Sequence, residues 1–221
     1  MNKVLRLFSW RNIRIINHTL SGRNRNRKQP ESGRITKEDI NLIIEETWEN
    51  YNILKQNAPF EKTLGARIML KNGIVSLALY RAIGKVAVGE DYATELCTDI
   101  LWKFYIKQIR VQRFIARFLH RKPQQQMNML QRIFLRFPLT RPGYDWKINE
   151  MGEVSAYDIT RCPVYDYFKS QGPNELEFFR NSWCTLDFPL AEYLVRGGKY
   201  ERTHTLSAGD DMCDMCWKVI R

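Results

Sequence analysis

Thiols and carboxylates gather in the last third of the sequence. Four of the five cysteines lie within residues 158–221, and acids stand close to them. Asp187 follows Cys184 by three residues, and Asp214 follows Cys213 directly. Thiols near carboxylates can attack an electron-poor carbon, with the acid as proton acceptor or as the partner of a cationic substrate. The sequence therefore places the candidate chemistry in this region and leaves open which of the two cysteines is the nucleophile.

A metal site is the alternative use of these residues. Cys213 and Cys216 have the Cys-x-x-Cys spacing of zinc sites, with Cys184, Cys162 and His204 as further candidate ligands. A second pair at ligand spacing is missing, and positions three apart in a strand point to opposite faces. We therefore expect no cofactor, with zinc as the alternative.

Six short motifs follow one another through the same region. They are Asp-Ile-Thr-Arg-Cys-Pro (158–163), Tyr167–Gly172, Glu175-Leu176, Cys184 with Asp187, Arg-Thr-His-Thr-Leu (202–206) and Gly-Asp-Asp-Met-Cys-Asp (209–214). Upstream, Leu-Ala-Leu-Tyr-Arg-Ala-Ile (77–83) precedes them. In this order and with these gaps, the motifs resemble the C-terminal signature of the L-2-amino-thiazoline-4-carboxylic acid hydrolase family.

The resemblance implies an enzyme that opens the thiazoline ring of a cyclic isothiourea amino acid with water, giving N-carbamoyl-cysteine. Attack at C2 and cleavage of the C2–S bond need an acid, a base and a cation for the substrate carboxylate. Matched by position, the resemblance implies Cys184 or Cys213 as nucleophile, and Asp187 or Asp214 as general base or amidinium partner. It implies Arg202 as the carboxylate clamp.

Further residues take substrate-binding roles by the same resemblance. Thr203 and Thr205 would supply hydrogen bonds, Asp211 would shape the turn that presents the following cysteine, and Cys162 would line the site. The expected partner is a small-molecule substrate. The alternative is a non-catalytic protein of the same fold that binds a small molecule or senses a metal.

The elements that must position these residues follow from periodicity. Apolar spacing predicts helices over residues 37–56, 64–86, 91–119 and 127–137, the first with Thr36 as N-cap. After Pro138 the pattern predicts strands over 144–149, 154–159, 200–206 and 212–219, and short helices over 162–170 and 174–183. The predicted class is α+β, a helical N-terminal half packed on a small antiparallel sheet with short helices in the C-terminal half.

The basic residues are concentrated at the N-terminus of the chain. Residues 1–34 hold nine Lys or Arg against one acid, and most of the net charge of +11 that the whole chain carries therefore lies in this segment. We predict a basic, partly flexible segment there, with a flexible linker over 21–32 and a helix over 1–20 that could contact a membrane surface weakly. Residues 35–221 are predicted as a single hydrolase-like domain, helical over 35–137 and α+β over 138–221.

Composition excludes several classes of protein. With 44% hydrophobic and 27% charged residues, the chain is expected to fold. It has no apolar run long enough to span a membrane, and five cysteines indicate thiols, so we expect a cytoplasmic protein. Basic residues from Arg110 to Lys122 alternate with Phe114 and Phe118. We interpret them as a solvated helix face, so nucleic acid is not an expected partner, and the oligomeric state stays open.

Overall fold

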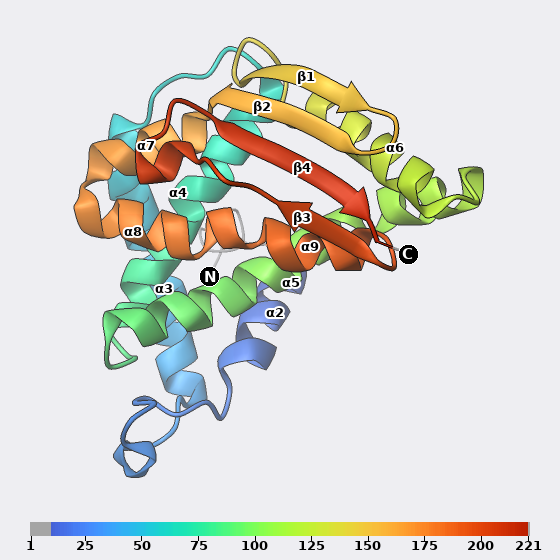
Figure 1. Ribbon diagram of the computed structural model, residues 1–221. Coiled ribbons are helices and arrows are strands. Elements are labelled where there is room, and N and C mark those ends of the chain that lie inside the picture. The colour runs from blue at the N-terminus through green and yellow to red at the C-terminus, as the bar shows by residue number, and fades with distance from the viewer. Residues whose placement is uncertain (1–9, 221) are drawn as a thin grey trace. The chain divides into compact units, whose positions relative to one another are not determined.

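The computed structural model describes residues 10–220 (Figure 1). Its helices are α2 (Trp10–Leu20), α3 (Lys37–Leu54), α4 (Leu64–Gly84), α5 (Glu90–Leu119), α6 (Pro123–Arg136), α7 (Pro163–Gln171), α8 (Pro173–Asn181) and α9 (Asp187–Leu194). The strands are β1 (Asp145–Met151), β2 (Ser155–Arg161), β3 (Gly198–Glu201) and β4 (Cys213–Val219). Short 3-10 turns are η1 (Pro30–Ser32), η2 (Lys55–Asn57), η3 (Trp183–Thr185) and η4 (Leu206–Ala208). The predicted α+β class is confirmed.

The described residues form two compact units. The first contains the residues up to Ala58 together with Asn72–Tyr105, and the second contains Pro59–Lys71 together with the residues from Ile106 onward. Helices α4 and α5 therefore each contribute to both units. The predicted division of the chain near residues 34 and 137 stays a prediction. Within residues 10–220, no helix is both long and apolar enough to cross a membrane.

Unit 1 is helical and begins, in its described part, with α2. The predicted capping box of α3 is present, since Asp39 N donates to Thr36 Oγ1 at 3.3 Å and Thr36 N donates to the Asp39 carboxylate at 2.8 Å. Helix α2 packs on α3 and buries Ile16 and Leu20 completely. The helix predicted over residues 1–20 is thus present from Trp10, and residues 1–9 lie outside the described part.

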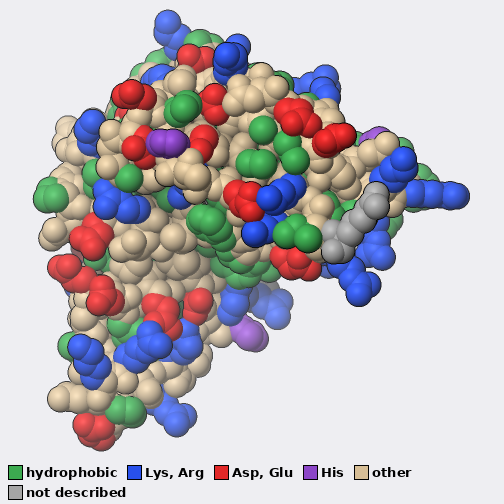
Figure 2. Space-filling model, in the orientation of Figure 1, with side chains coloured by type: hydrophobic (Ala, Val, Ile, Leu, Met, Phe, Trp, Pro, Cys, Tyr) green, Lys and Arg blue, Asp and Glu red, His purple; other side chains and the backbone are tan. Residues whose placement is uncertain are grey.

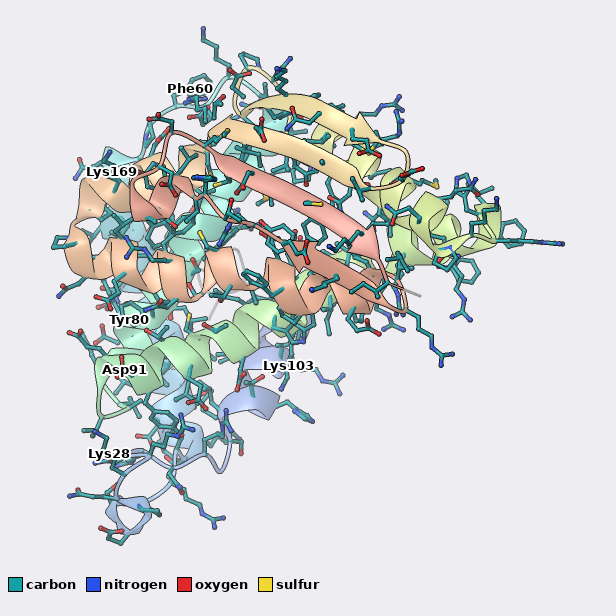
Figure 3. All side chains as sticks on the ribbon, viewed as in Figure 1. Lys28, Phe60, Tyr80, Asp91, Lys103 and Lys169 are labelled. Carbon is teal, nitrogen blue, oxygen red and sulfur yellow. The ribbon has the colours of Figure 1, made fainter. Side chains whose placement is uncertain are left out.

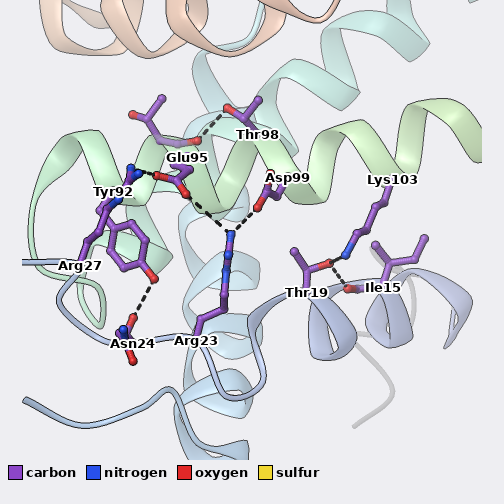
Figure 4. Close-up of polar contacts among 11 residues, drawn as sticks. Ile15, Thr19, Arg23, Asn24, Arg27, Tyr92, Glu95, Thr98, Asp99 and Lys103 are labelled. Atoms are coloured by element: carbon purple, nitrogen blue, oxygen red, sulfur yellow. Dashed lines mark hydrogen bonds and ion pairs between the residues drawn. The ribbon is translucent and has the colours of Figure 1, made fainter. Parts of the chain in front are cut away.

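The segment predicted as a flexible linker is held by contacts within unit 1 (Figure 4). Arg23 Nη2 lies 2.5 Å from Asp99 Oδ2, and Arg27 pairs with Glu95. The two acids lie on α5, about seventy positions away along the chain, so local composition could not reveal them. Part of the positive charge of residues 1–34 is therefore used in internal ion pairs.

Unit 2 contains an antiparallel sheet in the order β1-β2-β4-β3. Helix α6 packs on β2 and β4, and Tyr157 OH donates to Gln131 Oε1 at 2.9 Å between them. Ile159 on β2 is paired with Cys213 on β4. Because β2 and β3 both run antiparallel to β4, the ends of β2 and β3 meet the beginning of β4 at one end of the sheet.

Alternation along the strands decides which side chains lie under the helices. Ser155, Tyr157 and Ile159 are buried on one face of β2, and Met215 and Trp217 are buried beside them on β4. The same alternation places further side chains on this covered face, namely Tyr200 of β3 and Cys213 of β4.

Two elements differ from the predictions. The strand expected over residues 200–206 ends at Glu201 and is followed by η4, and α9 was not predicted. Helix α9 packs on β3 at Gly198, where an added Cβ would lie 2.1 Å from the carbonyl oxygen of Ala191. A glycine is therefore required where the strand passes the helix.

Candidate functional site

The candidate site lies where the sheet meets the turns around η3 and η4. Cys162 follows β2, Arg202 follows β3 and Cys213 begins β4, so strand pairing alone brings these three residues to one end of the sheet. Cys184 in η3 and Asp187 at the start of α9 join them from the helical side. In Figure 3, sulfur atoms drawn in yellow lie where this end of the sheet meets α7 and α8. We call these five residues the C-terminal cluster.

Cys213 accepts a hydrogen bond from the backbone of η4. Its Sγ accepts a hydrogen bond from Leu206 N at 3.4 Å and lies 3.4 Å from Thr205 Oγ1. The turn that supplies these groups is η4, which Gly209 closes in the left-handed region at φ 102°. A backbone N–H directed at sulfur stabilises negative charge there, which is what a nucleophilic thiolate needs.

The thiols of Cys184 and Cys162 are protonated at physiological pH. Burial raises the pKa of Cys184 to about 11, although its bond to Ser207 Oγ at 3.5 Å acts in the opposite direction. Burial likewise raises the pKa of Cys162 to about 12, although backbone hydrogen bonds from Tyr165 and Val164 act in the opposite direction. Of the two cysteines left open by the sequence, the hydrogen-bonding geometry favours Cys213 over Cys184 as the nucleophile.

Asp187 and Arg202 form the charged part of the cluster. Burial raises the pKa of Asp187 to about 7, despite the lowering effect of the Arg202 guanidinium. Arg202 Nη2 donates to the carbonyl oxygen of Cys184 at 3.2 Å, and its guanidinium lies within 6 Å of the ring centroids of Phe188 and Tyr200. A carboxyl group that titrates near neutral pH can both take and return a proton under physiological conditions.

Tyr200 is a site residue that the sequence reasoning missed. Its side chain is 3% exposed, and its hydroxyl has no hydrogen-bond partner among the described residues. Burial raises the pKa of Tyr200, with a further contribution from Asp187, so the hydroxyl remains a donor. Its burial follows from the pairing of β3 with β4, which sets Tyr200 against Trp217, and this pairing is not evident from the sequence. Ser207 was missed as well, and no sequence signal marks it.

The structure places Asp214 and Thr203 away from the cluster. Asp214 lies on the face of β4 opposite to Cys213 and accepts bonds from Thr203 N at 2.9 Å and His204 N at 2.6 Å. Burial acts to raise the pKa of Asp214, but these hydrogen bonds outweigh burial and lower it to about 2. A carboxylate held in this way anchors the turn and is a weak proton acceptor.

Asp211 also lies apart from the cluster. It is exposed and lines a surface hollow of about 410 Å³ together with His204, Gly209, Asp210 and Met212. The volume is that of small-molecule sites. The lining consists of the loop before β4 and includes no member of the C-terminal cluster, so hollow and cluster are neighbouring but separate features.

The ligand set for zinc does not assemble in the described part of the chain. Within residues 10–220, no three His, Cys, Asp or Glu side chains converge as metal ligands. Cys213 and Cys216 lie on opposite faces of β4, since they are an odd number of positions apart in one strand. The five cysteines are free thiols.

Comparison with known proteins identifies the family. No curated protein and no solved structure gives a significant match to the chain. The family model described as L-2-amino-thiazoline-4-carboxylic acid hydrolase matches residues 66–217, well over half of the chain, and this range contains every residue of the C-terminal cluster. The chain therefore belongs to the L-2-amino-thiazoline-4-carboxylic acid hydrolase family.

Proposed function

We propose that the protein is a hydrolase that opens the ring of a cyclic isothiourea such as L-2-amino-thiazoline-4-carboxylate. The observation that carries this proposal is the convergence of Cys213, Asp187 and Arg202 at one end of the sheet. A donor-supported thiol, a carboxyl group with a pKa of about 7 and a guanidinium are the three kinds of group that the reaction needs.

In the first step, the Cys213 thiolate attacks C2 of the ring. The C2–S bond breaks, and the ring sulfur leaves and takes up a proton, so that C2 remains bonded to Cys213 Sγ as an open-chain isothiourea. Leu206 N, which donates to Sγ in the free protein, supports the thiolate before attack. The guanidinium of Arg202 binds the substrate carboxylate as the clamp.

In the second step, water attacks the same carbon. Asp187 accepts a proton from the water as the new C–O bond forms, and the bond from carbon to Cys213 Sγ breaks. The product is N-carbamoyl-cysteine, and the thiol is regenerated. The buried Tyr200 hydroxyl is a donor for the bound substrate, which would satisfy a polar group that is otherwise unpaired.

The test is incubation of the protein with L-2-amino-thiazoline-4-carboxylate. We expect one new thiol for each ring opened, measured with a thiol reagent after removal of the protein, and N-carbamoyl-cysteine identified by mass. Calorimetric binding without thiol release would instead identify a non-catalytic binding protein of this fold. Absence of both binding and turnover would refute this substrate class.

A further inference from the structure

The C-terminal part of α5 carries large apolar side chains on its solvent side. Five of them are between 42 and 81% exposed. They are Val111, Phe114, Ile115, Phe118 and Leu119. Their spacing of three, four, seven and eight positions places them on one face of the helix. We call this face the α5 stripe.

The opposite side of the same helix is fixed to unit 2. Ile109 and Ala116 are buried, and Arg113 Nε donates to the carbonyl oxygen of Leu194 at 3.3 Å. The Arg113 guanidinium also lies 4.5 Å from the centre of the Tyr193 ring. The part of the helix over residues 109–116 is therefore packed on unit 2, and the α5 stripe on its other side is exposed.

The charge around the stripe has a single sign. Between Asp99 and Asp145 the sequence contains ten Lys or Arg and no acidic residue. Arg110 and Arg117 are exposed on the side of α5 that borders the stripe, and Arg121 is exposed two residues after the end of the helix. Figure 2 shows Lys and Arg side chains gathered at the right edge of the view, where α5 ends and α6 begins.

We propose that the α5 stripe is a docking surface for an anionic lipid bilayer. Helices that lie in the membrane interface bury an apolar face while basic side chains contact anionic head groups. The stripe provides the apolar face, with Phe114 and Phe118 as its largest side chains, and Arg110, Arg117 and Arg121 provide the charge. This surface belongs to unit 2 and is distinct from the basic N-terminal segment.

Two other occupants fit the surface less well. A second copy packed antiparallel on the same face would place the two sets of arginines side by side, and like charges repel at such distances. Nucleic acid would satisfy the arginines, but bases stack on aromatic rings, whereas Val111, Ile115 and Leu119 offer only aliphatic surface. An anionic bilayer complements both the charge and the aliphatic surface.

The test is co-sedimentation of the full chain with vesicles. Vesicles made of phosphatidylcholine and phosphatidylglycerol in roughly equal parts are compared with phosphatidylcholine alone. The test variant is Phe114→Ser with Phe118→Ser, and the matched control is Ile53→Ser with Phe60→Ser, which removes two apolar side chains that are 63 and 81% exposed elsewhere. Circular dichroism and size-exclusion chromatography establish that each variant is folded and report its oligomeric state.

We expect the parent chain and the control variant to sediment with the anionic vesicles only. The stripe variant should bind at least roughly tenfold more weakly, because each Phe loses its apolar burial. Arg117→Gln with Arg121→Gln should also weaken binding, and added salt should weaken it in the parent. Equal binding by the stripe and control variants, or no binding to anionic vesicles, would overturn the proposal. A dimer that the parent and the control variant form and the stripe variant does not form would also overturn the proposal. Binding to a DNA duplex in preference to the vesicles would overturn it as well.

Discussion

At the scale of single residues, the pKa of Asp187 determines which proton transfers the C-terminal cluster can perform. A carboxyl group with a pKa of about 7 is present in both protonation states near neutral pH. The thiol of Cys184, with a pKa of about 11, stays protonated there, and Asp214, with a pKa of about 2, stays ionised. We therefore assign proton transfer to Asp187 among these three groups.

Replacing Asp187 with Asn should remove the base. We expect kcat/KM of the parent to rise with pH around a midpoint near 7, because the carboxylate is the active form. Asp187→Asn should lower kcat about a hundredfold or more and abolish this limb of the profile. Asp214→Asn is the matched control and should keep the limb, whereas a limb that persists in Asp187→Asn would assign the ionisation to another group.

The same substitution has a signature in stability. The folded-state pKa of Asp187 is raised above its ordinary value of 3.8, so folding opposes ionisation of this carboxyl group. The resulting destabilisation is absent below pH 4 and complete above pH 7. Asp187→Asn should therefore raise Tm at pH 8 relative to the parent and leave it unchanged at pH 4, as measured by thermal unfolding.

Tyr200→Phe tests the unpaired hydroxyl. Removing a buried hydroxyl that has no partner should leave stability unchanged or raise it by about 1 kcal/mol, since this hydroxyl loses its hydrogen bonds to water on folding and gains none in return. If the hydroxyl binds substrate, KM should rise roughly tenfold at the same time. Loss of stability together with an unchanged KM would show that the hydroxyl serves the fold and not the ligand.

At the scale of elements, the sequence predicted most helices because their signals are local. The capping box at Thr36 and the apolar spacing of α3 to α5 depend on residues within a few positions. Helix α6 begins at Pro123, four residues before its predicted start, since proline is suited to the first turn. Helix α9 was missed because its apolar residues are nearly continuous and show no clear period.

The candidate site was predicted only in part, because the motifs are local signals whereas strand pairing is not. Motif order located Cys184, Asp187 and Arg202, which the fold brings together. Cys213 and Asp214 were assigned to one site, although neighbours in a strand must face opposite sides. Tyr200 could be recognised only with the strand pairing, since its burial depends on Trp217 across the ladder.

Packing of α9 on β3 sets the position of Asp187, and Gly198 is where the two elements touch. An added methyl group there would lie 2.1 Å from backbone, so Gly198→Ala should destabilise the protein by about 3 kcal/mol and reduce turnover. Gly152→Ala is the control, because its added Cβ would meet only a flexible Glu150 side-chain oxygen at 3.9 Å. Equal midpoints of urea unfolding in the two variants would show that the contact is not tight.

At the scale of the whole molecule, unit 2 is built from two stretches of chain. The shorter stretch, Pro59–Lys71, carries Glu61, which is 5% exposed. Its carboxylate accepts a bond of 2.7 Å from Arg161 Nη2 at the end of β2. This ion pair between the buried Glu61 and the partly exposed Arg161 joins the two stretches within unit 2, directly before Cys162.

Breaking this pair should therefore affect the unit as a whole. Arg161→Ala leaves the buried Glu61 without its cation and should lower the free energy of unfolding by about 3 kcal/mol. Arg141→Ala is a suitable comparison. Both side chains of the ion pair between Arg141 and Asp145 are exposed, so this pair should contribute less than about 1 kcal/mol to the free energy of unfolding. Similar losses in the two variants, measured by urea unfolding, would argue against a structural role for the Glu61 pair.

The distribution of charge separates the candidate chemistry from the basic character of the chain. Arg23 and Arg27 of the N-terminal segment are paired with acids of α5 within unit 1, whereas the C-terminal cluster lies entirely in unit 2. A change of salt concentration should therefore affect the interactions of the basic surfaces more than the chemistry of the cluster.

The central claim is that the thiol on the covered face of β4 carries the reaction, and a pair of cysteine variants tests it most directly. Cys213 and Cys216 lie on the same strand but on opposite faces. Turnover of L-2-amino-thiazoline-4-carboxylate should fall about a thousandfold or more in Cys213→Ser. It should stay near the parent value in Cys216→Ser. Full turnover in a folded Cys213→Ser variant would contradict the account.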